Sequence, residues 1–221
     1  ESDRMLQLAF NKKSLEVQRK VVIEEFNQRY LNQPYGDLWL LLRPLAYRVH
    51  PYRWATIGMA PEHIRDATME DVKMFYERYY NPDNAILSVA ADLEHDRVFE
   101  LAEKWFGEIP RGTSFQDNIP VEPTQTEARR LEVERPVPSS IVMIVFHIGN
   151  RTSREFAVCV VISDLLSNGN SSRMYQPLVV EKGLFSSVNA SVTGELVLEL
   201  FFVTGRLLLH TSVSTADKAP W

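Results

Sequence analysis

The run Ser140-Ile141-Val142-Met143-Ile144-Val145-Phe146-His147-Ile148 is the stretch on which the fold prediction depends. Its branched and aromatic side chains are typical of a β-strand. After it, residues 155–166 have a helical period, residues 171–181 predict a second helix, and residues 184–209 predict two or three strands. Residues 130–134 predict one more strand before it. The order β-α-α-β-β indicates an α+β fold rather than an array of parallel strands joined by helices.

The half of the chain that precedes this region is predicted to be mainly helical. Apolar residues recur at a helical period from about residue 15 to residue 31, among them Val21, Val22 and Phe26. Three further helices are predicted over residues 37–47, from the N-cap Thr68 onward, and over residues 95–106. Residues 85–91 are predicted to form a short buried strand.

Between the two halves lies a stretch with little regular pattern. Residues 110–127 hold Pro110, Pro120 and Pro123, few apolar residues and no sustained period. This composition is typical of a linker between domains. We therefore predict a first domain over residues 1–110, a linker over residues 111–127, and a second domain over residues 128–221.

The composition excludes several classes of protein. With 24 Lys and Arg against 29 Asp and Glu, the 221-residue chain has a net charge of −5, which argues against a nucleic-acid binder. Its longest apolar runs are far shorter than the ~18 residues that a membrane span needs. A hydrophobic content of 45% excludes disorder of the whole chain. The single cysteine, Cys159, excludes an internal disulfide, and its apolar neighbours predict a buried, inert thiol.

Few residues form a pattern that indicates chemistry. The five histidines are scattered, with no pair at a spacing typical of a zinc site. The segment from Ser167 to Arg173 lacks the pattern of a phosphate-binding loop, and a turn that caps the next helix accounts for it better. Glu25 follows Val21 and Val22 near the apolar stripe of the first long helix. From the spacing alone, a carboxylate that reaches solvent at the edge of this stripe is the simpler interpretation of Glu25.

Several motifs in collinear order resemble those of the pitrilysin/insulinase family of zinc metallopeptidases. The resemblance covers nearly the whole chain. The residues that carry it are Glu1-Ser2-Asp3-Arg4-Met5, Arg19-Lys20-Val21-Val22-Ile23-Glu24-Glu25, Asn32-Gln33-Pro34-Tyr35-Gly36, His50-Pro51-Tyr52, Phe75-Tyr76, Tyr79-Tyr80-Asn81-Pro82, Asn84-Ala85-Ile86-Leu87, Ser171-Ser172-Arg173-Met174-Tyr175 and Gly183-Leu184. The resemblance implies a pair of related α+β domains of the pitrilysin type, LuxS/metalloenzyme-like α/β sandwiches joined by the linker, each only partly present here.

The resemblance also implies a zinc site and a role for Glu25. Members of the family bind Zn²⁺ through the two histidines of an HxxEH motif and a glutamate far downstream, and Glu25 matches that glutamate. An acidic residue that supports the ligand seven positions earlier in the family is Gln18 here. No HxxEH motif occurs in the chain. We therefore expect a piece of a longer protein, which is inactive by itself because catalytic zinc needs three protein ligands.

Two further positions depart from the family pattern. Where many members have an arginine and a tyrosine that contact substrate, this chain has Val179 and Ser186. The resemblance implies zinc-dependent hydrolysis of peptides or unfolded protein segments. Val179, Ser186 and Gln18 favour the alternative, a non-catalytic member that binds peptide or acts as a partner or scaffold subunit. The expected partners are a peptide or protein substrate and a second copy or a related subunit, and family members occur in the periplasm, the cytoplasm and organelles.

Overall fold

The computed structural model describes residues 1–112, 118–209 and 211, and its contacts divide the chain into two compact units. The first unit comprises Glu1–Glu127 and the second comprises Ala128–Trp221. The interpretation of residues 111–127 as a linker between two related domains stays a prediction. The helix start predicted at residues 214–218 lies outside the described residues.

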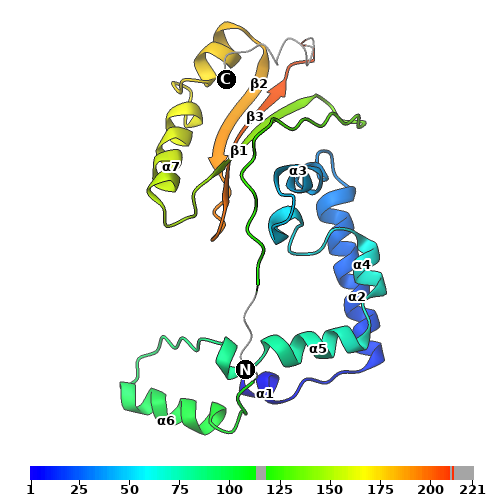
Figure 1. The fold of residues 1–221 in the computed structure, drawn as a ribbon, viewed down its shortest axis with the longest axis vertical. Helices are drawn as coiled ribbons and strands as arrows, with labels where there is room; N and C mark the ends of the chain where they lie inside the picture. The colour runs from blue at the N-terminus through cyan, green and yellow to red at the C-terminus, as the bar shows by residue number, and fades with distance from the viewer. Residues whose placement is uncertain (113–117, 210, 212–221) are drawn as a thin grey trace. The chain divides into compact units, whose positions relative to one another are not determined.

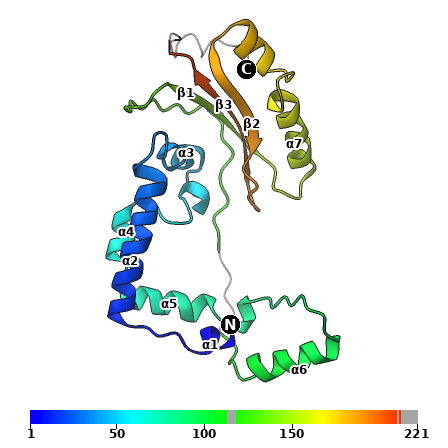
Figure 2. The same cartoon turned by 180° about the vertical axis from the view of Figure 1, so that it is seen from behind.

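The first unit is helical, as predicted. Its elements are α1 (Ser2–Leu6), α2 (Lys12–Phe26) with a π-helical turn (Asn27–Leu31), α3 (Leu38–Ala46), a 3₁₀ turn (Pro51–Arg53), α4 (Pro61–Asp66), α5 (Met69–Tyr79), a 3₁₀ turn (Pro82–Asn84) and α6 (His95–Phe106). Figures 1 and 2 both show α4 lying beside α2. Helix α4 was not expected from the sequence, although Pro61 at its first position is a common helix start.

Local sequence accounts for where two of these helices begin. The side chain of Asn11 accepts a hydrogen bond from the Ser14 amide at 2.8 Å and caps α2. Thr68 caps α5 in a reciprocal arrangement with Asp71: the Thr68 hydroxyl accepts from the Asp71 amide, and the Asp71 carboxylate accepts from the Thr68 amide. The prediction that Thr68 begins a helix is therefore confirmed.

The prediction of a buried strand at residues 85–91 is wrong. The structure assigns no strand there, and the segment is exposed, with 97% of the Ile86 surface accessible. Among the described residues, the sheet contains only strands of the second unit. A strand forms only when a neighbour takes its backbone hydrogen bonds, and apolar composition cannot supply that neighbour.

The second unit is built on an antiparallel sheet of three strands in the order β1-β3-β2. Strand β1 (Ile141–Ile148) and strand β2 (Phe185–Val192) both pair with the central strand β3 (Glu199–Leu207). The register places Ile148 opposite Glu199 and Ala190 opposite Val203. Ser186 is an extra residue in β2, because the pairing shifts between Phe185 and Ser187 and forms a β-bulge.

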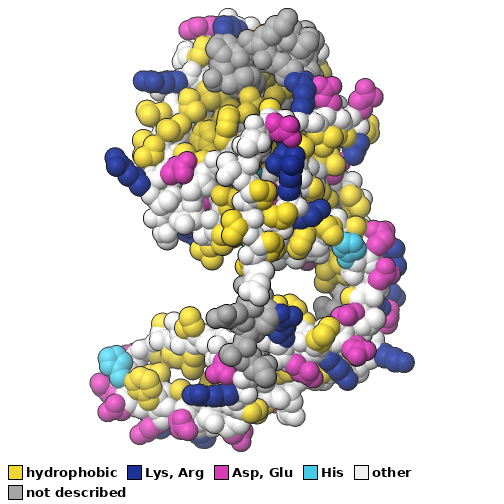
Figure 3. Space-filling model, viewed as in Figure 1, with side chains coloured by type: hydrophobic (Ala, Val, Ile, Leu, Met, Phe, Trp, Pro, Cys, Tyr) yellow, Lys and Arg dark blue, Asp and Glu magenta, His cyan; other side chains and the backbone are white. Residues whose placement is uncertain are grey.

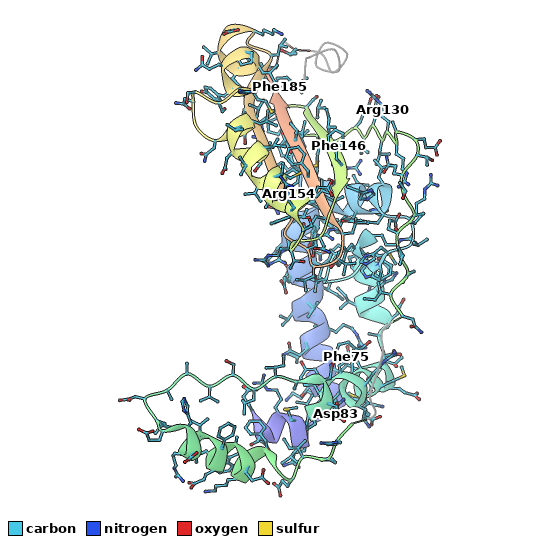
Figure 4. The ribbon with its side chains drawn as sticks, turned by 60° about the vertical axis from the view of Figure 1, so that its left-hand side comes forward. Phe75, Asp83, Arg130, Phe146, Arg154 and Phe185 are labelled. Carbon is cyan, nitrogen blue, oxygen red and sulfur yellow. The ribbon has the colours of Figure 1, made fainter. Side chains whose placement is uncertain are left out.

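One face of this sheet carries the core of the unit. Helix α7 (Arg154–Ser167) and the π-helical segment Tyr175–Glu181 lie on that face, as Figures 1 and 2 show. The buried side chains that meet there are Ile148, Met174, Leu178, Phe185, Ala190, Phe201, Val203 and Leu207. Figure 4 shows Phe185 at the beginning of β2 and Phe146 on β1. The mixture of helices and antiparallel strands agrees with the α+β fold class.

Two predictions for the second unit need correction. Residues 130–134 form no strand, because no other strand pairs with them in the described part of the chain. The helix predicted over residues 171–181 begins only at Tyr175 and has π-type hydrogen bonding, since residues 171–174 form a turn. This turn contains Ser172 and Arg173 and precedes the helical segment, as expected, but no side-chain hydrogen bond caps the segment that follows it.

Both units expose large apolar side chains, which Figure 3 shows as yellow atoms. On α7, Val161 and Leu165 are 59% and 54% accessible, although other residues of the helix face the core. A helix that is apolar on two sides normally packs on both of them. No helix in the described ranges is both long enough and apolar enough to cross a membrane.

Candidate functional site

The candidate metal ligand, Glu25, lies one residue before the end of α2. The next residue, Phe26, is 1% accessible, and its ring lies 5.1 Å from that of Tyr30 in the π-helical turn. This aromatic contact anchors the end of the helix. The side chain of Glu25 is 52% accessible, so the helix presents its carboxylate to solvent.

Glu25 has an ion-pair partner on its own helix. The Nη2 atom of Arg29 lies 3.6 Å from the Oε1 atom of Glu25, at the i,i+4 spacing that brings two side chains together on a helix. The neighbouring Glu24 accepts a hydrogen bond from Gln28 at 3.0 Å, again four residues later. Exposed pairs of this kind contribute about 0–1 kcal/mol, so a stronger ligand can displace Arg29 from Glu25. Sequence reasoning did not single out Arg29, although the spacing of the two residues was visible.

Gln18 lies seven residues before Glu25 and lines a shallow, mainly apolar groove of about 360 Å³ between α2 and α4. Residues of α2 line one side of the groove together with Gln18, and His63 and its neighbours in α4 line the other side. The full lining is Leu15, Gln18, Arg19, Val22, Ile57, His63, Ile64 and Ala67. Arg19 joins the two helices, because its Nη2 donates to the carbonyl of Ala67 at 2.5 Å.

Val179 and Ser186 lie in the second unit and have structural contacts. Val179 belongs to the segment Tyr175–Glu181 and packs against the buried core. Ser186 is exposed in the bulge of β2, where its hydroxyl donates to the carbonyl of Arg206 at 3.2 Å. A valine in the core and a small hydroxyl in a bulge supply neither a cation nor a phenol. These two positions therefore cannot provide the electrostatic assistance of an arginine and a tyrosine.

Comparison with known proteins then decides the family. A family model described as the peptidase M16 inactive domain matches residues 66–208. This chain belongs to the M16, or pitrilysin/insulinase, family of zinc peptidases. Among the relatives of this M16 chain, the zinc protease PqqE of Helicobacter pylori is 33% identical over 172 residues, which are 76% of this chain and 38% of PqqE. The β subunit of the mitochondrial-processing peptidase of Caenorhabditis elegans is 25% identical over 129 residues, covering 58% of this chain and 28% of the subunit.

A solved structure agrees with this assignment. The crystal structure of a protease from Helicobacter pylori matches with a TM-score of 0.81 and 28% identity, covering 97% of this chain and 52% of that protein. This M16 chain thus spans well under two thirds of the relatives that it matches. The fold of its described residues is that of an M16 peptidase domain.

The zinc that the M16 family implies needs more ligands than these residues bring together. Nowhere in residues 1–112, 118–209 and 211 do three His, Cys, Asp or Glu side chains gather closely enough to hold a metal ion. Catalytic zinc takes three protein ligands and a water molecule. The described residues of this M16 chain therefore do not form a complete zinc site, and Glu25 offers a single carboxylate.

Proposed function

We propose that this chain belongs to an M16 zinc protease, to which it contributes one metal ligand, Glu25, and the inactive domain. The observation that carries the proposal is the exposed carboxylate of Glu25, which lies beside the buried Phe26 at the end of α2. Its ion pair with Arg29 is long and can be displaced. The remaining ligands would come from residues outside this sequence. The described residues support metal binding at one position and do not by themselves define a catalytic step.

For the complete protein, we infer hydrolysis of peptides or of unfolded protein segments. This inference rests on the M16 family match and on the names of relatives such as PqqE, which is called a zinc protease. Within such an enzyme, the unit Ala128–Trp221 would bind and orient the peptide. The match to the inactive domain supports that non-catalytic role for most of the chain.

The contacts of Val179 and Ser186 favour a second candidate, a member of the family that acts as a partner subunit and does not cleave peptide. Val179 is partly buried against the core, and the hydroxyl of the exposed Ser186 donates to the backbone of β3, so neither side chain offers a substrate the cation of an arginine or the phenol of a tyrosine. A relative that is named as a subunit, the β subunit of the mitochondrial-processing peptidase, supports the idea of a partner of the same family.

The proposal is tested by comparing Glu25→Gln with Glu24→Gln in the complete protein. Each amide keeps the shape of the side chain and removes its charge, while the two residues lie about 100° apart around the helix. We expect Glu25→Gln to lose most of the bound zinc and of the peptidase rate, and Glu24→Gln to retain both. Metal content after dialysis is measured for both variants, alongside the rate.

Each outcome of this comparison has one meaning. Loss of zinc from the Glu24 variant alone would show that the ligand is Glu24. If both variants keep their zinc, Glu25 is not a ligand. Unmodified complete protein that binds peptide without zinc and without cleavage would establish the second candidate.

A further inference from the structure

Helix α7 of the second unit has two apolar sides. On one side, Phe156, Cys159 and Leu166 pack against the buried core, and Ser163 is 8% accessible. This side lies on the sheet, as Figures 1 and 2 show. A second set of apolar side chains on the same helix stays 38–59% accessible, namely Val158, Val161, Ile162 and Leu165. We call these four residues the outer stripe of α7.

The outer stripe runs along the side of α7 that faces away from the core. Its members recur at intervals of three and four residues, so they share one face of the helix over about two turns. Val161 at its centre lies about 160° around the helix from the buried Ser163. Isolated exposed apolar residues are common on protein surfaces, whereas a contiguous apolar row marks a surface that another element covers.

The form of the outer stripe indicates what kind of element covers it. Rows of side chains three and four residues apart on one helix fit between the corresponding rows of a second helix. The matching occupant is therefore an amphipathic helix with apolar residues at the same spacing. With such a helix in place, α7 is covered on both of its apolar sides, which its sequence requires.

The charges of α7 argue against a membrane surface as the occupant. Helices that lie on a bilayer carry several Lys and Arg residues beside their apolar face. Helix α7 has one basic residue, Arg154, and two acidic residues, Glu155 and Asp164. The acidic residues are exposed on opposite sides of the outer stripe, where they would repel anionic lipid. A protein helix is the occupant that these charges favour.

The length of related proteins favours a helix of the same polypeptide over a second copy of this chain. This chain spans 38% of PqqE and 52% of the Helicobacter pylori protease of known structure. A complete protein of such length has at least about as many residues again, in which a further helix can form. A helix on the same polypeptide acts at an effective concentration of about millimolar, well above that of a second copy in dilute solution.

We propose that the outer stripe of α7 is the docking surface for an amphipathic helix of the complete M16 protein, formed by residues outside this sequence. Helix α7 is then the middle layer between the sheet and that helix. The inference rests on the proposal that this chain is part of a complete M16 protein. It involves neither zinc nor catalysis, so a failure of the metal proposal for Glu25 does not affect it.

Thiol labelling of the complete protein and of this chain tests the proposal. Val161→Cys places a thiol at the centre of the outer stripe, and Arg151→Cys places one in the exposed turn before α7 as the matched control. In the complete protein, we expect Val161→Cys to react with a disulfide reagent at least about ten times more slowly than Arg151→Cys, because a packed thiol reacts only when its site opens. In this chain by itself, the two rates should agree within about a factor of three. The unaltered protein, which retains Cys159, supplies the background rate.

A charged substitution supplies a second measurement in the same two proteins. We expect Val161→Asp to lower the unfolding midpoint of the complete protein by several degrees, because it buries a carboxylate without a partner. The same substitution in this chain should shift the midpoint by about one degree or less, since the side chain there faces water. Each protein is thus the control for the other.

Three results would overturn the proposal. The first is equal labelling of Val161→Cys and Arg151→Cys in the complete protein, and the second is an equal midpoint shift by Val161→Asp in both proteins. The third is slow labelling of Val161→Cys in this chain that becomes fast on dilution, which would show that a second copy covers the outer stripe. If Val161→Asp prevents the complete protein from folding, the two cysteine variants decide, since cysteine is close to valine in size.

Discussion

The hydroxyl of Ser167, at the end of α7, accepts a hydrogen bond from the amide of Ala190 in β2 at 2.9 Å, and its one hydrogen lies within reach of two carbonyls, those of Ala190 and Ser163, each at 3.2 Å. One side chain thereby pairs with the amide, and shares its hydrogen with the carbonyl, of a residue in an edge strand of the sheet. It ties the helix to the strand at a fixed position. Backbone groups in a partly buried setting need such partners.

Replacing Ser167 by alanine should therefore destabilise the second unit. We expect a loss of roughly 1–3 kcal/mol, the usual cost of leaving buried backbone groups without partners. Denaturant unfolding followed by circular dichroism measures it. Ser186→Ala is the control, because this exposed hydroxyl in the same strand should matter by about 0.5 kcal/mol or less. Equal effects of the two substitutions would contradict the role assigned to Ser167.

Two phenylalanines of the sheet should differ strongly in their contribution to stability. Phe185 is fully buried among α7, the π-helical segment and β3, whereas Phe146 is 55% accessible. We expect Phe185→Ala to cost about 3–5 kcal/mol and Phe146→Ala about 1 kcal/mol or less. Thermal or denaturant unfolding of both variants measures the difference. A larger cost for Phe146→Ala would show that β1 is covered in solution.

The pKa of Asp71 should depend on the cap of α5. The hydrogen bond from the Thr68 hydroxyl, followed by that from the Thr68 amide, holds the pKa of this carboxyl below its usual value of 3.8. Because the folded state lowers the pKa, the cap stabilises the protein above pH 4 and loses this contribution as the pH falls through the lowered value. Thr68→Ala should raise the pKa toward 3.8, and Thr68→Ser should not. Carbon NMR titration of the Asp71 carboxyl is the measurement.

The thiol of Cys159 should react slowly. Burial, and to a smaller extent the charge of Glu155, raise its pKa above the usual 9.0, so little thiolate is present near pH 7. We expect its reaction with a disulfide reagent at pH 7 to be at least ten times slower in the native chain than in denaturant. Glu155→Gln should accelerate the native reaction by a smaller factor. Equal native and denatured rates would mean that α7 does not protect the thiol.

Only part of the candidate metal site could be predicted from the sequence. Glu25 and Gln18 could be placed on one helix, since a helical period fixes which residues share a face. Their partners could not be placed so simply. Arg29 contacts Glu25 at a visible i,i+4 spacing, but the groove at Gln18 needs His63 from α4, a helix that the sequence analysis did not expect. The hydrogen bonds from the amides of Arg48 and His50 to the carboxylate of Glu122 join parts of the chain that no local pattern connects.

The sequence by itself determined the elements that local chemistry specifies. The cap at Thr68 and the helix His95–Phe106 follow from capping residues and periodicity, which act within a few residues of the chain. Tertiary structure alone decided whether an apolar run becomes a strand. Residues 85–91 and 141–148 are both mainly apolar and were both expected to be strands, yet only the second run pairs with β3. The physical reason is that a strand takes its hydrogen bonds from a neighbour distant in sequence, whereas a helix supplies its own.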